Sequence, residues 1–221
     1  MRAILVGDGD VPARSTLDDA WRGWDAGAAL VVAADGGATK ALAAGIHPDL
    51  VVGDADSLGP EGVAAIRAAG IPMEVVSAAK DESDLELALA AAVERGATSI
   101  SVLGAMGGPR FDHALANVWL LAHPAVADRE VVLLDDRTRV RLLDASAAPA
   151  RVELIGRRDD LVTLLPFGAD AEGVTTEGLT WALTDEPLRA GPARGLSNVR
   201  SRADARVSLR SGRLLIVETR T

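Results

Sequence analysis

Cysteine is absent from this 221-residue chain. Without thiols there is no disulfide framework, no thiolate metal site and no nucleophilic thiol chemistry. No apolar run reaches the ~18 residues that a membrane span needs. The chain opens directly on a strand pattern, Ala3–Val6, with no signal-peptide h-region. We therefore expect a cytoplasmic protein without a membrane segment.

Basic and aromatic residues are also scarce. The formal net charge is −9 and no basic run occurs, which argues against a nucleic-acid partner. Tyr is absent, and the aromatic residues are two Phe and four Trp, so few side chains can stack on a flat ligand. Lysine occurs only as Lys40 and Lys80, while arginine carries the remaining positive charge.

Three familiar site motifs are missing. There is no G-x-x-x-x-G-K-[ST] sequence, which excludes a Walker P-loop, and no G-x-G-x-x-G after the first strand, which leaves a Rossmann dinucleotide site unsupported. There is also no G-x-S-x-G elbow, so an α/β-hydrolase site is not indicated.

The first two thirds of the chain alternate between strand-like and helical patterns. The expected strands are Ala3–Val6, Leu30–Ala34, Leu50–Val52, Met73–Val76, Ser99–Leu103 and Val131–Leu134. The expected helices are Thr16–Trp24, Ala38–Ala44, Glu61–Ala69, a strongly periodic one from Leu85 to just before Gly96, and Phe111–Ala122. This alternation predicts a domain over residues 1–145 with an open, mostly parallel α/β sheet, a Rossmann-like three-layer arrangement.

The pattern changes after a small-residue linker at 145–150. Helical periodicity disappears, and Gly, Pro and Asp punctuate short apolar runs. The expected strands are Arg151–Leu154, Leu161–Leu165, Ala171–Thr176, Thr180–Leu183, Arg206–Leu209 and Leu214–Thr219. We predict a second domain over residues 150–221, a C-terminal antiparallel β-sandwich.

The most informative stretch is Leu50–Ser57, where three apolar residues and a glycine precede Asp54 and Asp56. In an extended segment, residues two apart point to the same side, so these carboxylates can converge. Such a pair repels unless a cation or a proton intervenes, and Mg²⁺ is commonly held by one or two carboxylates plus substrate phosphates. The alternative is a solvated polar turn.

Four other polar or glycine-rich loops follow predicted strands: Gly7-Asp8-Gly9, Asp35-Gly36-Gly37, Lys80–Asp84 and Gly104–Arg110. In an open α/β sheet, ligands bind beyond the carboxyl ends of the strands, so the five loops lie at one rim. Alone, Asp35-Gly36-Gly37 is more often a turn and Gly107-Gly108 can be a flexible connector. Their joint placement favours a phosphate and metal site.

The segment Lys80-Asp81-Glu82-Ser83-Asp84 opens the most regular helix. Capping by Asp81 or Ser83 and the helix dipole account for one or two acids. They do not account for Lys80 at the positive end of a helix, whereas a nearby phosphate does. Asp81 and Asp84 share a helix face.

A comparable segment begins at Arg110 and leads into the helix from Phe111. Asp112 can cap that helix, and Arg110 follows two glycines whose amides can approach a phosphate. His113 and Asn117 lie one turn apart on one helix face, and we interpret His113 as a structural hydrogen-bonding residue.

Together these motifs are similar, in order and spacing, to the thiamin pyrophosphokinase family. They are Asp35-Gly36-Gly37-Ala38, Pro48-Asp49, Gly53-Asp54-Ala55-Asp56-Ser57, Lys80-Asp81-x-Ser83-Asp84 and Gly107-Gly108-x-Arg110-Phe111-Asp112-His113-x-x-x-Asn117. In the second domain, Gly195-Leu196-Ser197-Asn198 resembles the thiamin-binding part of the family. Some members place a Trp shortly after the Ser-Asn pair, but Val199–Leu209 contains no aromatic residue here.

The resemblance implies transfer of a pyrophosphoryl group from ATP to the hydroxyl of thiamin, with release of AMP. It implies Mg²⁺ held by Asp54, Asp56 and Asp84, with Lys80 as a fourth catalytic residue and Arg110 balancing charge. The residues that it assigns to ATP are Asp35, Gly36, Gly37, Ser57, Asp81, Ser83, Gly107, Gly108, Arg110, Asp112, His113 and Asn117. It assigns Ser197 and Asn198 to thiamin, and it implies a homodimer in which one subunit's α/β domain and the other's sandwich share the thiamin site.

Three other readings stay open at this point. The chain could be a metal-dependent phosphatase with Asp54 as nucleophile, although that leaves Lys80–Asp84 and the Ser197-Asn198 domain unexplained. It could be a pyrophosphokinase acting on another alcohol, such as a pterin. It could also be a nucleotide-binding sensor that does not turn over, against which retention of the full set of acids argues.

Overall fold

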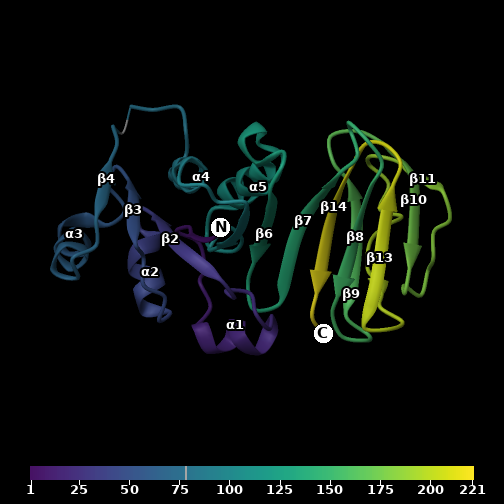
Figure 1. The fold of residues 1–221 in the computed structure, drawn as a ribbon, viewed down its shortest axis with the longest axis horizontal. Coiled ribbons are helices and arrows are strands. Elements are labelled where there is room, and N and C mark those ends of the chain that lie inside the picture. Colours follow the sequence, from purple (N-terminus) through teal and green to yellow (C-terminus); the bar gives the residue numbers. More distant parts are fainter. Residues whose placement is uncertain (78) are drawn as a thin grey trace. The chain divides into compact units, whose positions relative to one another are not determined.

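The computed structural model describes residues 1–77 and 79–221, which form two compact units, 1–136 and 137–221. Each unit is described by itself (Figure 1). The division falls before the predicted linker at 145–150, which instead connects two strands of the second unit. In the part of the chain that the structure describes, no helix is long and apolar enough to cross a membrane.

The first unit contains an open sheet with helices on both faces (Figure 1). Its elements are β1 (Arg2–Val6), α1 (Arg14–Ala20), β2 (Ala28–Ala34), α2 (Gly37–Ala43), β3 (Leu50–Gly53), α3 (Gly59–Ala68), β4 (Met73–Val75), α4 (Asp84–Glu94), β5 (Ser99–Leu103), α5 (Phe111–Trp119), the short 3₁₀ helices η1 (Leu120–Ala122) and η2 (Pro124–Val126), and β6 (Glu130–Leu134). The strand order is β4-β3-β2-β1-β5-β6, and every pair is parallel. The predicted α/β fold class is therefore confirmed.

The order of the strands determines where a ligand can bind. From β1 the chain moves outward through β2, β3 and β4, then returns to the other side of β1 with β5 and β6. Connections on the two sides of β1 leave the sheet in opposite directions, which opens a crevice at the carboxyl ends of β1 and β5. The loops that follow β1 and β5 are Gly7-Asp8-Gly9 and Gly104–Arg110.

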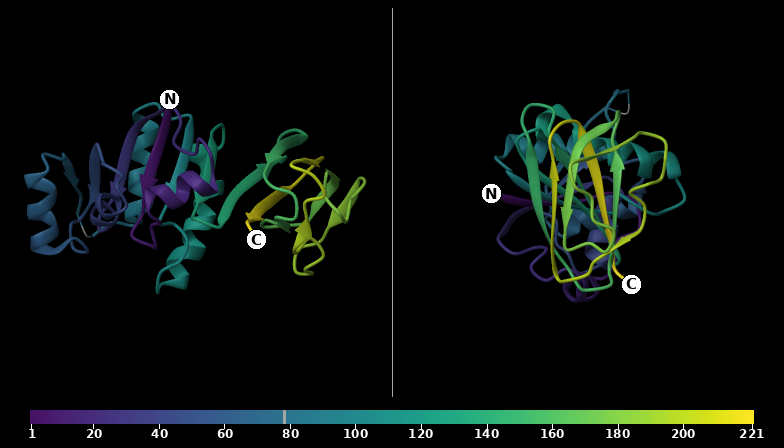
Figure 2. Two further views of the ribbon diagram at one scale, coloured as in Figure 1. Left: turned by 90° about the horizontal axis from the view of Figure 1, so that it is seen from below. Right: turned by 90° about the vertical axis from the view of Figure 1, so that its right-hand side faces the viewer.

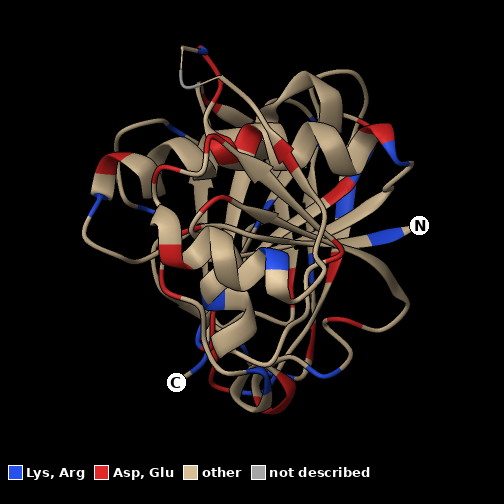
Figure 3. Ribbon diagram, turned by 90° about the vertical axis from the view of Figure 1, so that its left-hand side faces the viewer, with Lys and Arg blue, Asp and Glu red and all other residues tan. Residues whose placement is uncertain are grey.

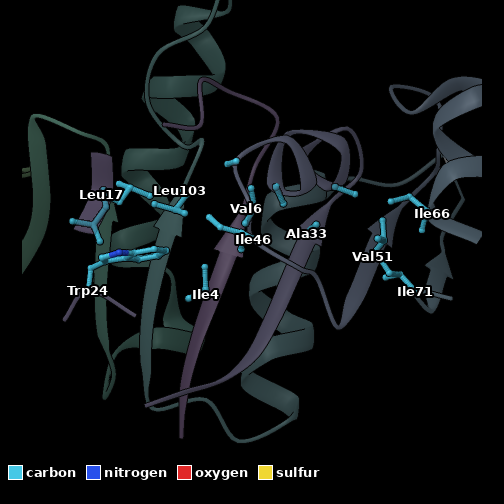
Figure 4. Close-up of a cluster of buried hydrophobic side chains, with 14 of the residues drawn as sticks. Ile4, Val6, Leu17, Trp24, Ala33, Ile46, Val51, Ile66, Ile71 and Leu103 are labelled. Carbon is cyan, nitrogen blue, oxygen red and sulfur yellow. The ribbon is translucent and has the colours of Figure 1, made fainter. Parts of the chain in front are cut away.

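Apolar side chains on both faces hold these strands in place. Figure 4 shows one cluster, in which Ile4, Val6, Ala33, Val51 and Leu103 from the strands meet Leu17, Trp24, Ile46, Ile66 and Ile71. Helix α4 packs on β1, β2 and β3 through Leu85, Ala88, Leu89 and Ala92, all buried. The periodicity that predicted this helix therefore marks its buried face.

The second unit is a sandwich of two antiparallel sheets (Figure 2). Its strands are β7 (Thr138–Asp144), β8 (Ala150–Ile155), β9 (Leu161–Pro166), β10 (Ala171–Glu177), β11 (Glu186–Leu188), β12 (Asn198–Val199), β13 (Asp204–Leu209) and β14 (Arg213–Thr219). One sheet has the order β12-β9-β14-β7 and the other β11-β10-β13-β8. Alternate residues of β13 and β14 are buried, as expected for strands with one face on the core.

One predicted strand of this unit is wrong, and three strands were missed: β7, β11 and β12. Residues 180–183 form no strand, because only Leu179 and Leu183 turn inward and Trp181 between them is 61% exposed. The longest of the missed strands, β7, begins Thr138-Arg139-Val140-Arg141. Arginines occupy two of these four positions, so the segment does not look like an apolar strand.

Those arginines take part in a buried ion-pair cluster in the second unit. Glu218, which is 2% exposed, accepts hydrogen bonds from Arg139 at 2.7 and 2.6 Å and pairs with Arg141 and Arg200. Arg200 is 1% exposed and donates to the carbonyl oxygen of Leu154 at 2.8 Å. Burial lowers the pKa of Arg200, and the charge of Glu218 opposes that shift.

We expect Glu218→Gln to reduce the free energy of unfolding by ~3–5 kcal/mol, because it leaves the buried guanidinium of Arg200 without its counter-ion. Arg200→Met should cost less, since Glu218 keeps Arg139. Guanidinium chloride denaturation followed by fluorescence measures both. Glu153→Gln, which removes one partner of an exposed pair with Arg206, is the matched control and should change little. Equal losses for Glu218→Gln and Glu153→Gln would contradict this account.

Candidate active site

A cavity of about 410 Å³ lies at the crevice between β1 and β5. Its walls come from the loops after β1, β2 and β5, from the start of α4 and from α5. The lining residues include Gly7, Asp8, Gly9, Asp35, Lys40, Ser57, Lys80, Ser83, Asp84, Gly104, Gly107, Gly108, Arg110, His113 and Asn117. The predicted convergence of loops at one rim is therefore present in the structure.

Backbone without side chains forms one wall of this cavity. The amide of Gly9 donates to the carbonyl oxygen of Gly104 at 2.9 Å. A Cβ atom on Gly9 would lie 2.5 Å from that oxygen, and one on Gly104 would lie 2.4 Å from the carbonyl oxygen of Gly7. Only glycine lets the two loops approach so closely. A ligand there meets backbone groups, as polyphosphates commonly do.

Three carboxylates converge beside this wall. Asp35, Asp54 and Asp84 each offer an oxygen within 4.8 Å of the others. They come from three places in the chain: the end of β2, the end of β3 and the first residue of α4. Gly53 makes this possible, because a Cβ atom there would lie 2.8 Å from the Cβ of Asp35. The result is a compact set of hard oxygen ligands, which suits Mg²⁺ or a similar divalent cation.

Asp35 is the most constrained of the three. It is 2% exposed and has a φ of 42°, a left-handed conformation that is unusual for a residue with a side chain. Its Oδ2 accepts from the amide of Ser57 at 3.0 Å, while its Oδ1 is buried and has no hydrogen-bond partner among the described residues. Burial raises the pKa of Asp35. A buried carboxylate oxygen without a partner is costly unless a ligand satisfies it.

Asp56 reaches this group from its exposed side, and interaction with the side chains of Asp54, Ser57 and Asp35 lowers the pKa of Asp56. Its side chain is exposed, and it accepts from the hydroxyl of Ser57 at 3.2 Å. The prediction assumed an extended segment, but Ala55 has a φ of 67°, so the chain turns sharply between the two aspartates. The structure also brings Asp35 to Asp54 and Asp84, with one oxygen of each within 4.8 Å of the others.

Lys80 lies against the same carboxylates. Its ammonium hydrogen-bonds to Oδ1 of Asp84 and lies 3.8 Å from Oδ2 of Asp54, and its side chain is 14% exposed. Burial acts to lower the pKa of Lys80, but the hydrogen bond and the negative charges of Asp84, Asp54 and Asp35 outweigh it and raise the pKa. Lys80 is therefore a firmly protonated cation within the acidic cluster.

The start of α4 explains how Lys80 and Asp84 are presented. Ser83 is the N-cap, and its hydroxyl accepts from the amide of Glu86 at 3.2 Å. The cap places Asp84 in the first turn, where the helix dipole favours an acid. Asp81, in contrast, is exposed and does not line the cavity.

The residues around Arg110 reach the cavity with their polar groups already in use. Arg110 makes a two-point contact with Asp112, at 2.9 and 2.6 Å, and holds the pKa of that carboxyl well below its usual range. The amide of Gly108 donates to Asp10 at 2.8 Å, and Asn117 donates to the carbonyl oxygen of Ala105 at 2.9 Å. Asp10 and Asn117 thus brace the loop after β5.

Sequence reasoning did not place Lys40 in this cavity. Lys40, from α2, lies 3.0 Å from Oδ1 of Asp8, and both residues line the cavity. The two lysines of the chain therefore line one cavity, although they are 40 residues apart in the sequence. Their rarity in an arginine-rich chain was the signal that could have found Lys40.

Figure 3 shows how the acidic and basic residues are distributed on one side of the molecule. Red and blue segments are scattered over several helices and loops and do not form a single band. The acidic residues of the chain are therefore not confined to the cavity. What distinguishes Asp35, Asp54 and Asp84 is the short distance between their carboxylate oxygens.

The second unit holds a well-defined turn around Ser197 and Asn198. Asn198 is 8% exposed; its side chain accepts from the amide of Trp181 at 3.1 Å and donates to the carbonyl oxygen of the same residue at 2.7 Å. Ser197 has a φ of 55°, and its amide donates to the hydroxyl of Thr163 at 2.9 Å. A Cβ atom on Gly195 would lie 2.0 Å from the carbonyl oxygen of Leu164.

Trp181 is the aromatic residue that sequence reasoning did not find beside the Ser-Asn pair. It precedes Asn198 by 17 residues, and the side chain of Asn198 fixes its backbone. Its ring is left 61% exposed. Its backbone is fixed beside a strained polar turn, so this exposed aromatic side chain is a candidate surface for stacking.

Comparison with known proteins gives the same picture from independent information. Residues 22–133 match the family model described as thiamin pyrophosphokinase, catalytic domain, and residues 151–214 match thiamin pyrophosphokinase, vitamin B1 binding domain. Thiamine pyrophosphokinase of Bacillus subtilis is 27% identical over 193 residues, which cover 86% of this chain and 87% of that protein. Thiamine pyrophosphokinase 2 of rice (Oryza sativa subsp. japonica) is 30% identical over 158 residues, which cover 69% of this chain and 58% of that protein.

Solved structures agree over the whole length. The Bacillus subtilis thiamine pyrophosphokinase structure has a TM-score of 0.85 at 24% identity and covers 99% of both chains. That of Geobacillus thermodenitrificans has a TM-score of 0.82 at 26% identity and covers 100% of this chain and 98% of the other. With both family models matched in order, the chain belongs to the thiamin pyrophosphokinase family.

Proposed function

We propose that this protein transfers the pyrophosphoryl group of ATP to the hydroxyl of thiamin, giving thiamin diphosphate and AMP. The observation that carries the proposal is the combination of three carboxylates and a partly buried lysine with a glycine-lined cavity in a member of this family. Positioning and charge neutralisation are the main contributions that a protein makes to this type of transfer. The cavity offers both.

The nucleotide is assigned to the first unit. Its triphosphate would lie along the backbone wall of Gly7, Gly9 and Gly104, where no side chain intervenes. Lys80 and Lys40 would contribute positive charge from two sides of the cavity. Arg110 adds a third cation at the rim, although its charge is shared with Asp112.

We assign a divalent cation, Mg²⁺ by the chemistry of its ligands, to Asp35, Asp54 and Asp84. The fit rests on the short separation of their oxygens and on the buried Oδ1 of Asp35, which lacks a partner within the protein. When bound, Mg²⁺ would neutralise charge on the transferring phosphoryl groups. Asp56, the sequence-based candidate, would contribute at most from the exposed side of the site.

Thiamin is assigned to the second unit. The exposed ring of Trp181 suits stacking against an aromatic ring, and its face attracts the positive charge of the thiazolium. Ser197, in its strained turn, presents a small hydrogen-bonding side chain next to Asn198, which holds the backbone of Trp181. Asn198 has a positioning role, because both ends of its amide are engaged by the backbone of Trp181.

A homodimer and a cytoplasmic location complete the proposal. The homodimer is supported by the family resemblance, and the location by the absence of cysteine from the sequence. Sedimentation equilibrium measures the first directly: a mass near twice 22.8 kDa is expected.

One assay separates this function from its rivals. Incubation with ATP, Mg²⁺ and thiamin should yield thiamin diphosphate and AMP in equal amounts, resolved by chromatography. A phosphatase would release inorganic phosphate, and a pyrophosphokinase for another alcohol would form AMP only with that alcohol. A nucleotide sensor would form no product.

The structure distinguishes two candidate metal sets, and substitution tests them. Asp35→Asn, Asp54→Asn and Asp84→Asn should each lower kcat by ~100-fold or more, because each removes a charge worth several kcal/mol in the transition state. Asp56→Asn should have a smaller effect, since its carboxylate is exposed and meets the group from the solvent side. Asp81→Asn, an exposed acid near the same helix, is the matched control. A larger loss for Asp56→Asn than for Asp35→Asn would favour the sequence-based set.

The thiamin assignment predicts a selective effect at Trp181. Trp181→Ala should raise the KM for thiamin ~10-fold or more, because stacking on an aromatic side chain is worth ~1–3 kcal/mol per ring. Trp181→Phe should recover most of this loss, and the KM for ATP should be unchanged in both variants. Steady-state kinetics with each substrate varied in turn provides the measurement. An unchanged thiamin KM in Trp181→Ala would refute the assignment.

A further inference from the structure

Lys80 and a divalent cation need the same oxygen atoms. The ammonium of Lys80 hydrogen-bonds to Asp84 and lies 3.8 Å from Asp54, two of the three carboxylates that would hold the metal. Its side chain is 14% exposed, so water screens this contact much less than an ion pair on the surface. The carboxylate group therefore has a cation of its own, built into the chain.

This arrangement balances charge within the protein. Three carboxylates so close together repel one another, and Lys80 offsets part of that repulsion without any ligand. A divalent cation that enters the group meets two opposing effects: attraction to three carboxylates and repulsion from an ammonium on the same atoms. The divalent cation must therefore either bind against the repulsion from Lys80 or bind after the ammonium of Lys80 has moved away.

A polyphosphate provides the place for Lys80 to go. Lys80 lines the same cavity as the glycine residues described above. Its ammonium group sits at the end of a flexible four-carbon side chain and can therefore change position. Phosphate oxygens in the cavity can accept the ammonium when it leaves Asp84. The carboxylates are then free to bind the divalent cation, and the positive charge of this cation also attracts the phosphate.

We propose that Lys80 is an exchangeable counter-ion of the Asp35, Asp54 and Asp84 carboxylates, which a divalent cation replaces as Lys80 moves to the bound polyphosphate. The proposal rests on the proposed function only in that the cavity takes a polyphosphate and the carboxylates take a divalent cation. It has two consequences. The nucleotide-free protein binds the metal weakly because of Lys80, and nucleotide and metal strengthen each other's binding.

The first consequence is tested with Mn²⁺ alone. Binding of Mn²⁺ to the nucleotide-free protein is followed by the electron paramagnetic resonance signal of the free ion. Lys80→Met should bind Mn²⁺ about tenfold more tightly than the wild type. Lys40→Met is the matched control, because Lys40 lines the same cavity but pairs with Asp8. It should bind as the wild type does.

Lys80→Arg separates charge from shape. It keeps the cation, so its Mn²⁺ affinity should remain near that of the wild type. Tighter binding in both Lys80→Met and Lys80→Arg would overturn the proposal, because loss of packing would then be the cause. Unchanged or weaker binding in Lys80→Met, or a gain of equal size in Lys40→Met, would overturn it as well.

The second consequence is tested with α,β-methylene-ATP, whose α–β bridge cannot be cleaved. Its affinity is measured by calorimetry with and without Mn²⁺, after correction for the complex that the two form in solution. We expect Mn²⁺ to improve the affinity by at least about fivefold in the wild type, and by clearly less in Lys80→Met. Equal improvement in both proteins would contradict the exchange. Failure of the proposed function would show separately, as the absence of AMP formation by the wild type.

Discussion

Mutual repulsion among three carboxylates is the constraint on which the first unit depends. Asp35, Asp54 and Asp84 are held within 4.8 Å of one another by a buried sheet and a capped helix that cannot relax without loss of packing. Folding therefore has to stabilise a concentration of negative charge. The ammonium of Lys80 does this within the protein, while burial raises the pKa of Asp35 because its charge remains costly there.

The backbone around the site is shaped by the same demand for close approach. Glycines after β1 and β5 bring two loops into direct contact, and Gly53 lets β3 pass against Asp35. These contacts occur at the point where the strand order reverses, which is where an open α/β sheet has a crevice without any special adaptation. The topology provides the crevice, and the glycines make it accessible to a bulky anion.

Much of this could be predicted from the sequence, because local patterns determine it. Apolar runs marked the strands, and the periodicity from Leu85 marked the buried face of α4. The loop residues that follow each strand were bound to meet at one rim once the sheet was known to be parallel. Lys80 could be singled out because a cation is unfavourable at the start of a helix.

The remaining features depend on backbone conformations that the residue types do not suggest. Asp35 and Ala55 have positive φ, which L-residues seldom adopt, so an extended reading of Asp54-Ala55-Asp56 could not show that Asp35 joins Asp54 and that Asp56 approaches from the exposed side. Trp181 was hidden for a different reason. Its neighbours Leu179 and Leu183 are buried, so the segment has the composition of a strand although its Trp faces water.

With the ligands of the proposed function, the two units would recognise them by opposite physical means, in keeping with their different construction. The first unit handles charge, so its groups are held by hydrogen bonds and ion pairs inside a crevice where water screens them poorly. The second unit offers the flat apolar ring of Trp181. Stacking on this ring depends on its being held in place and does not depend on charged groups around it. Asn198 supplies that rigidity by binding both the amide and the carbonyl of Trp181, and the strained turn at Ser197 is held in turn by Thr163. A stacking surface that is fixed beforehand loses little conformational entropy when its ligand arrives, so a single aromatic residue can serve a domain that contains so few.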